Sequence, residues 1–177
     1  MPLSPMPGLC MAFRLCGIPT WLHWSFPGVG LGIGVPAGLA SWWLAPDAAW
    51  ALFGWTALAV TAVVLVHEAG HVVVARLLGI EIEGLSFAAG GGCCLIGETD
   101  AHWRDLLYSG AGLLAQAVLA VALWPVAGTP WPLAPSPNGA VVLAATNGLL
   151  LVLNAWPSGH SDGMRIVRAW RAMRGTP

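Results

Sequence analysis

The chain has 177 residues, of which 57% are hydrophobic and only 8% are charged, with a formal net charge of −1. A soluble globular protein carries roughly 25% charged residues, so this composition excludes an ordinary water-exposed surface and indicates a single membrane-embedded domain over residues 1–177. The seven basic residues are all arginines and form no patch of the size that nucleic acid requires, which argues against a nucleic-acid-binding protein.

Four apolar stretches are candidates for membrane-spanning helices, each of which needs about 20 predominantly apolar residues. The expected spans are residues 21–44, 50–78, 106–126 and 139–163. The fourth is apolar only as far as Leu153, so the segment "NAWPSGHSDG" must complete the crossing as irregular backbone that faces a cavity or other protein. The expected fold class is an all-α polytopic membrane protein with about four transmembrane helices.

The arginines support four crossings, because with four spans all seven lie on one side of the membrane. By the positive-inside rule, both termini and the long middle loop are then cytoplasmic, and the protein is expected in an inner or plasma membrane. A cleaved signal peptide is the alternative for the first stretch. That stretch is long, and Arg14 is its only nearby positive charge, which favours a retained helix. The four cysteines show no CxxC spacing and are expected to be reduced, small apolar residues.

Two smaller elements are expected outside the spans. Between the second and third spans, apolar and acidic residues alternate and an "AAGGG" run follows, which predicts strands at about Glu81–Ala88 and Cys93–Gly97 in a cytoplasmic hairpin. This hairpin either caps the helices or offers an edge, at about 81–97, to which an extended substrate adds as a strand. After the fourth span, residues 164–174 alternate arginine with apolar residues and predict an amphipathic helix on the lipid bilayer surface.

The second span contains the sequence His67-Glu68-Ala69-Gly70-His71. Ionisable groups inside an apolar helix are costly, and residues i and i+4 share a helix face, so both imidazoles can reach one metal ion. This is the HExxH pattern of zinc hydrolases, in which Glu68 is the general base and zinc lowers the pKa of its water to about 7. A catalytic zinc usually has three protein ligands. Asp162, the other acidic residue expected within the membrane, is the candidate third ligand of one Zn²⁺ per chain.

The chain resembles the site-2 protease family, intramembrane zinc metalloproteases that cut transmembrane substrates. The resemblance is carried by "GIPTWLHWSF", "HEAGHVVVARLLGIEIEGLSF", "AGLLAQ" and "NAWPSGHSDG", which together are spread over most of the chain. It implies that His67, His71 and Asp162 bind zinc and that Glu68 is the general base. It also implies that Asn154 braces the broken segment that presents Asp162.

Two positions depart from the family pattern "AGPLAN": Leu113 stands where proline is common and Gln116 where asparagine is common. Gln116 can still donate a hydrogen bond to an oxyanion or a substrate carbonyl, although its side chain is longer. His160, two residues before Asp162, is a candidate for an additional metal ligand. The preferred interpretation is that His160 hydrogen-bonds one of the ligands or lines the site as a polar residue.

The expected function is a zinc metalloendopeptidase that cleaves transmembrane segments of membrane-protein substrates. Two alternatives belong to other classes. The substitutions at Leu113 and Gln116 would suit a catalytically inactive relative that binds membrane proteins. Intramembrane His, Glu and Asp residues also occur in small metal or proton transporters, which need a polar route on both sides of the site.

Overall fold

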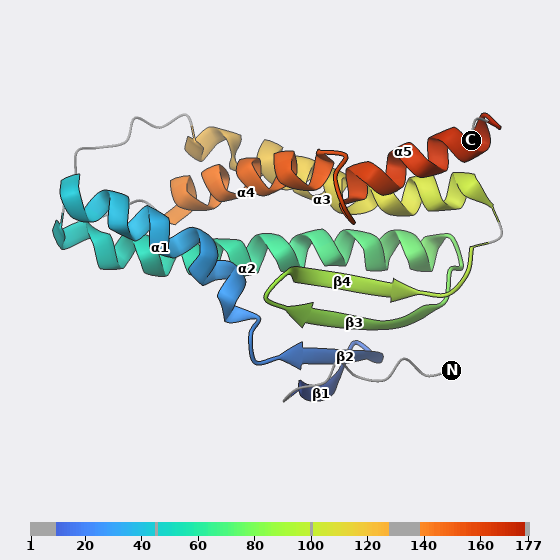
Figure 1. The fold of residues 1–177 in the computed structure, drawn as a ribbon, viewed down its shortest axis with the longest axis horizontal. Helices are drawn as coiled ribbons and strands as arrows, with labels where there is room; N and C mark the ends of the chain where they lie inside the picture. The colour runs from blue at the N-terminus through green and yellow to red at the C-terminus, as the bar shows by residue number, and fades with distance from the viewer. Residues whose placement is uncertain (1–9, 45, 100, 128–138, 176–177) are drawn as a thin grey trace.

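The computed structural model describes residues 10–44, 46–99, 101–127 and 139–175. In these residues, a small sheet and a set of helices alternate along the chain. The elements are β1 (Cys10–Leu15), β2 (Ile18–His23), α1 (Pro27–Leu44), α2 (Pro46–Leu77), β3 (Ile82–Ala88), β4 (Gly91–Ile96), α3 (His102–Ala127), α4 (Gly139–Ala155) and α5 (Asp162–Met173). Helix α2 is central: the sheet lies along one side of its C-terminal half, and α3, α4 and α5 lie on the other side (Figure 1).

Helix α2 ends at a defined point because Gly79 adopts a left-handed conformation, with φ 67°. The backbone N–H of Ile80 donates to the carbonyl of Ala75, and that of Gly79 donates to the carbonyl of Arg76, at 2.9 and 3.2 Å. These two bonds form a Schellman motif, which satisfies the last carbonyls of the helix. The chain therefore turns sharply after α2 and returns along it as β3.

The sheet has the order β1-β2-β3-β4, so the expected hairpin is present as β3 and β4 but is half of a larger sheet. Strands β1 and β2 form a second hairpin, and β2 pairs with β3 in parallel. Leu85, Phe87 and Cys94 from this sheet are buried together with Ala75 of α2 and Tyr108 of α3. This shared core fixes the sheet against the helix that carries the HExxH sequence.

The expected start of the first span at Trp21 is wrong, because residues 21–23 belong to β2 and the helix begins at Pro27. The N-terminal hairpin turns at Cys16 and Gly17, whose φ values are 50° and 84°. Two successive residues with positive φ form the tight turn that suits the twist of paired strands. Because Cys16 is an unusual residue for such a turn, the sequence did not indicate it.

A helix overlaps each of the four expected spans, but the ends of the later three differ as well. Helix α2 begins at Pro46, four residues before the expected start. Helix α3 begins at His102, four residues before the expected start. Helix α4 stops at Ala155, and irregular backbone is confined to residues 156–161. The C-terminal helix begins at Asp162, two residues earlier than expected, because the Ser161 side chain accepts a hydrogen bond from the N–H of Met164 and caps it.

Two of the described helices are long and apolar enough to cross a membrane, over Ala49–Leu77 and His102–Pro125. Helix α4 and residues 30–39 of α1 are apolar but shorter, so the four crossings stay a prediction. Large apolar side chains point outward, with Val121 75% and Trp124 77% exposed, whereas Gln116 is fully buried. An apolar exterior around buried polar groups supports a membrane protein.

Candidate metal centre

The two histidines of α2 face α3, and two glycines permit the close approach of these helices. A Cβ atom on Gly70 would lie 2.6 Å from the carbonyl oxygen of Ala111, so the backbones meet there with no side chain between them. A Cβ atom on Gly112 would lie 2.6 Å from Nε2 of both His67 and His71. Gly112 of α3 therefore leaves the space that the two imidazole rings occupy.

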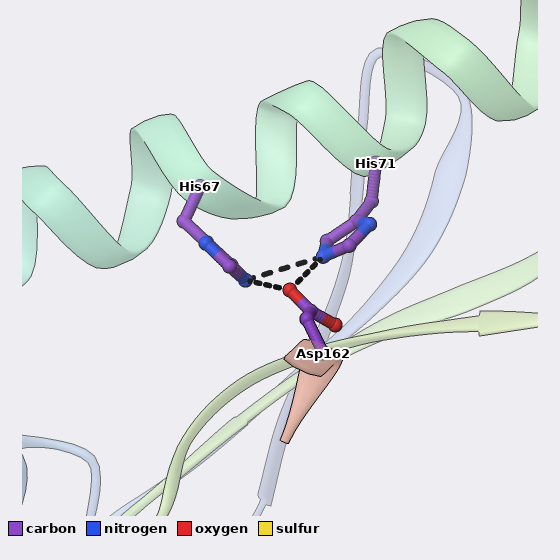
Figure 2. Close-up of side chains that lie close together, drawn as sticks. All are labelled: His67, His71 and Asp162. Atoms are coloured by element: carbon purple, nitrogen blue, oxygen red, sulfur yellow. Dashed lines mark hydrogen bonds and ion pairs between the residues drawn. The ribbon is translucent and has the colours of Figure 1, made fainter. Parts of the chain in front are cut away.

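His67, His71 and Asp162 form one cluster, although Asp162 comes from the far end of the chain (Figure 2). The Oδ2 atom of Asp162 lies 3.0 Å from Nε2 of His67 and 3.1 Å from Nε2 of His71, and the two Nε2 atoms are 3.2 Å apart. All three residues are buried. The first turn of α5 thus carries a carboxylate to the histidine face of α2.

The other ring nitrogen of each histidine is held by an oxygen acceptor. Nδ1 of His67 donates to Oε1 of Gln116 at 2.9 Å, and Nδ1 of His71 donates to the backbone carbonyl of Tyr108 at 2.9 Å. Asn154 supports the first pair, because its Nδ2 donates to the same Oε1 atom at 3.2 Å. With the proton on Nδ1, each imidazole turns the lone pair of Nε2 toward the cluster.

This donor set fits a zinc ion. Two Nε2 lone pairs and a carboxylate oxygen that face one another repel unless a cation or a proton lies between them. Zinc bonds of about 2.0–2.1 Å in tetrahedral geometry place neighbouring ligand atoms roughly 3.3 Å apart. The separations of 3.0, 3.1 and 3.2 Å in the cluster are close to that value. His67, His71 and Asp162 could therefore hold one Zn²⁺ with a fourth position open.

Glu68 lies between β4 and the cluster of His67, His71 and Asp162. The side chain is 5% exposed, and the Cys94 backbone hydrogen-bonds the carboxylate, whose Oε2 atom has no partner among the described residues. A Cβ atom on Gly92 would lie 2.5 Å from Cγ and 2.7 Å from Oε1 of Glu68. Gly92 therefore lets the strand approach the carboxylate, and one oxygen stays free to act on a proton.

Two cavities reach this centre. One, of about 400 Å³, borders all three cluster residues and Glu68, and also the exposed His160. The other, of about 110 Å³, runs between Glu68, Gln116 and the turn at Gly90. A small molecule or an extended peptide could thus reach Glu68 and the cluster together.

The remaining candidate residues, Gln116, Asn154 and His160, differ in their position relative to the cluster. The Oε1 atom of Gln116 accepts the hydrogen bond from Nδ1 of His67, on the side of the ring that faces away from the cluster. The buried Nε2 atom of Gln116 has no partner among the described residues, and the residue borders the smaller cavity. Asn154 is close to both Gln116 and His67. In the part of the chain that the structure describes, His160 is outside the group of side chains that could share a metal ion.

Sequence reasoning missed Tyr108 and Gly92, and it indicated Gly112 only as a residue that permits close contact between helices. Tyr108 contributes a backbone carbonyl to His71, and its hydroxyl donates to the carbonyl of Cys94 at 2.8 Å, which joins α3 to β4. A backbone acceptor has no signature in the sequence. The two glycines belong to a turn-like run and to a helix with several small residues, where the ordinary explanations are flexibility and helix packing.

No family model matches the chain, but a curated protein and a solved structure are among the known proteins that resemble it. A protein of Synechocystis sp. described as "Putative zinc metalloprotease" is 33% identical over 123 residues, which is 68% of this chain. The chain spans about a third of that relative's length, at 32%. The structure of a site-2 protease from Methanocaldococcus jannaschii matches with a TM-score of 0.69 at 21% identity, over 95% of this chain and 74% of that one. The predicted resemblance to the site-2 protease family is therefore confirmed, and the fold of this chain is the fold of that family.

Proposed function

We propose that the chain is an intramembrane zinc metalloendopeptidase that cleaves transmembrane segments of other membrane proteins. The observation that carries this proposal is the meeting of His67, His71 and Asp162 within 4.8 Å of one another, directly beside a buried glutamate. The names of the two similar proteins point to the same chemistry. We assign one Zn²⁺ to each chain and place both termini in the cytoplasm.

Zinc bound at the cluster supplies a Lewis acid that makes water acidic near neutral pH. Glu68 takes the proton from the attacking water through its free Oε2 atom and then gives it to the leaving amine of the substrate. The Cys94 backbone holds the carboxylate during both transfers. The unpaired Nε2 atom of Gln116 is a donor for the substrate carbonyl or the oxyanion that develops from it.

The substrate is proposed to bind as an extended strand along β4. In the sheet order β1-β2-β3-β4, the far edge of β4 has no neighbouring strand among the described residues, and Gly90 and Gly92 border both cavities. A helical peptide bond is already hydrogen-bonded within its helix, so unwinding onto an edge strand exposes the carbonyl for attack. His160 is proposed to line the route of the substrate, because it is exposed where the larger cavity opens.

The two alternatives are less well supported. Gln116, which motivated the inactive relative, hydrogen-bonds His67 and so fulfils a role that suits an intact metal site. A transporter needs a polar route across the membrane, yet residues 50–66 of α2 contain no ionisable side chain.

The test is zinc content and proteolysis of the purified chain, with Glu68→Gln and Asp162→Ala beside the wild type. The wild type is expected to hold one zinc and to cut a transmembrane substrate in liposomes. Glu68→Gln should keep the zinc and lose cleavage, whereas Asp162→Ala should lose most of both. Full cleavage by Glu68→Gln would refute the general-base role, and no zinc in the wild type would refute the metal site.

A further inference from the structure

Another cavity lies between the beginning of α3 and the middle of α5, apart from the two at the metal centre, and the proposed function does not use it. It measures about 310 Å³, at the lower end of the roughly 300–1,000 Å³ found for ligand pockets. Helix α3 contributes His102, Asp105 and Ser109, and α5 contributes Arg165 and Arg168, while alanines on α5 leave the space open. The cavity therefore brings basic and hydroxyl groups from two helices together.

The cavity has an excess of positive charge. Arg165 and Arg168 are three residues apart and so lie on one face of α5. Neither guanidinium forms an ion pair with a carboxylate in the part of the chain that the structure describes. The Arg165 guanidinium lies over the ring of Tyr108 at 4.9 Å, and Asp105, the acidic residue of the lining, accepts a hydrogen bond from the hydroxyl of Thr99. Two fixed positive charges thus face one carboxylate.

A buried hydroxyl gives an independent indication of a ligand. Ser109 is 1% exposed, and its Oγ atom has no hydrogen-bond partner among the described residues, yet the side chain borders this cavity. An unpaired buried polar group is costly, by about 1–3 kcal/mol. A ligand with acceptor oxygens would satisfy this hydroxyl and the two guanidinium groups together.

We propose that this cavity binds a phosphate group, held by Arg165, Arg168 and the hydroxyl of Ser109. The planar guanidinium groups match the oxygens of phosphate in a two-point geometry. Two arginines opposed by Asp105 leave about one net positive charge, which suits the single negative charge of a phosphodiester. A phospholipid headgroup and a free phosphate share this chemistry, and the experiment separates them.

Binding of a phosphate group at this site would stabilise the position of Asp162 at the metal centre. Arg165 borders both this cavity and the larger cavity at the metal centre, and α5 begins with Asp162. A phosphate group that fastens α5 to α3 would therefore also hold Asp162 against the two histidines. This consequence rests on the proposed function, whereas the binding itself does not.

The test measures binding to the purified 177-residue chain in detergent. The ligands are short-chain phosphatidylglycerol, with phosphatidylcholine as the comparison lipid, and inorganic phosphate, with chloride at equal ionic strength. Arg168→Gln and Ser109→Ala are expected to weaken binding about tenfold, because each removes a hydrogen bond to a charged ligand. Arg174→Gln is the matched control. It removes the same charge at the C-terminal end of α5, but its guanidinium lies over Trp170 and Arg174 does not line the cavity.

Each outcome supports or overturns the proposal. Selective loss of phosphatidylglycerol binding in Arg168→Gln and Ser109→Ala supports a lipid headgroup, and the same selective loss for inorganic phosphate supports a soluble phosphate source. Equal weakening by Arg168→Gln and Arg174→Gln would show general surface attraction and would overturn the proposal. No measurable binding of either ligand to the wild type would overturn it as well.

Discussion

Gly112→Ala is expected to weaken zinc binding although it removes no ligand. The added Cβ atom would lie 2.6 Å from Nε2 of both His67 and His71. Ordinary contact begins at roughly 3.5 Å, so the rings or the helices must separate by about 0.9 Å. The rings cannot rotate away freely, because Gln116 and the carbonyl of Tyr108 hold their Nδ1 atoms.

A displacement of that size is several times the tolerance of about 0.2 Å that metal–ligand distances allow. We therefore expect the zinc affinity to fall by about 10–100-fold, the range seen when the groups that orient ligands are removed. The assay is a chelator-competition titration of zinc in detergent, with the melting temperature measured in parallel. Gly110→Ala is the matched control, because a Cβ atom there would meet nothing within 4 Å. Equal zinc affinity in the two variants would refute the packing argument.

Three further changes test the groups around the centre. Gln116→Leu is expected to weaken zinc binding by about tenfold, because it removes the acceptor that orients His67; unchanged affinity in the same titration would contradict this. Tyr108→Phe should cost about 1–2 kcal/mol of stability, since the buried carbonyl of Cys94 loses its donor, and an unaltered melting temperature would argue against that bond. Ser161→Ala should cost about 1 kcal/mol through the lost cap of α5, and circular dichroism during thermal unfolding would record it. Ser161→Thr should restore the stability, because its hydroxyl can accept from Met164 and donate to the carbonyl of Trp156 as the serine does.

The central part of the fold could be predicted from the sequence because local signals determine it. The long apolar run of α2, the glycine that ends it and the i, i+4 spacing of His67 and His71 are properties of one continuous segment. The strands that became β3 and β4 were indicated by alternation and by glycines in the same way. Only their ends were shifted, by one or two residues.

The features that could not be predicted depend on pairing between distant segments. The parallel pairing of Thr20 with Leu85 joins strands on either side of two helices, and the sequence near Thr20 continues smoothly into an apolar stretch. The role of Gln116 was open because an amide can accept or donate, and only its position behind His67 shows which atom is used. The carbonyl of Tyr108 is a backbone group that every residue possesses.

The position of Asp162 has a consequence for the order in which the protein is assembled. During synthesis, His71 leaves the ribosome 91 residues before Asp162, so the nascent chain can form α2 and the sheet while the third ligand does not yet exist. Two imidazoles alone coordinate zinc more weakly than a complete three-residue set. The proposed hydrolytic centre therefore stays incomplete until α5 has packed onto α3. A partly synthesised chain is then expected to be unable to cleave other membrane proteins.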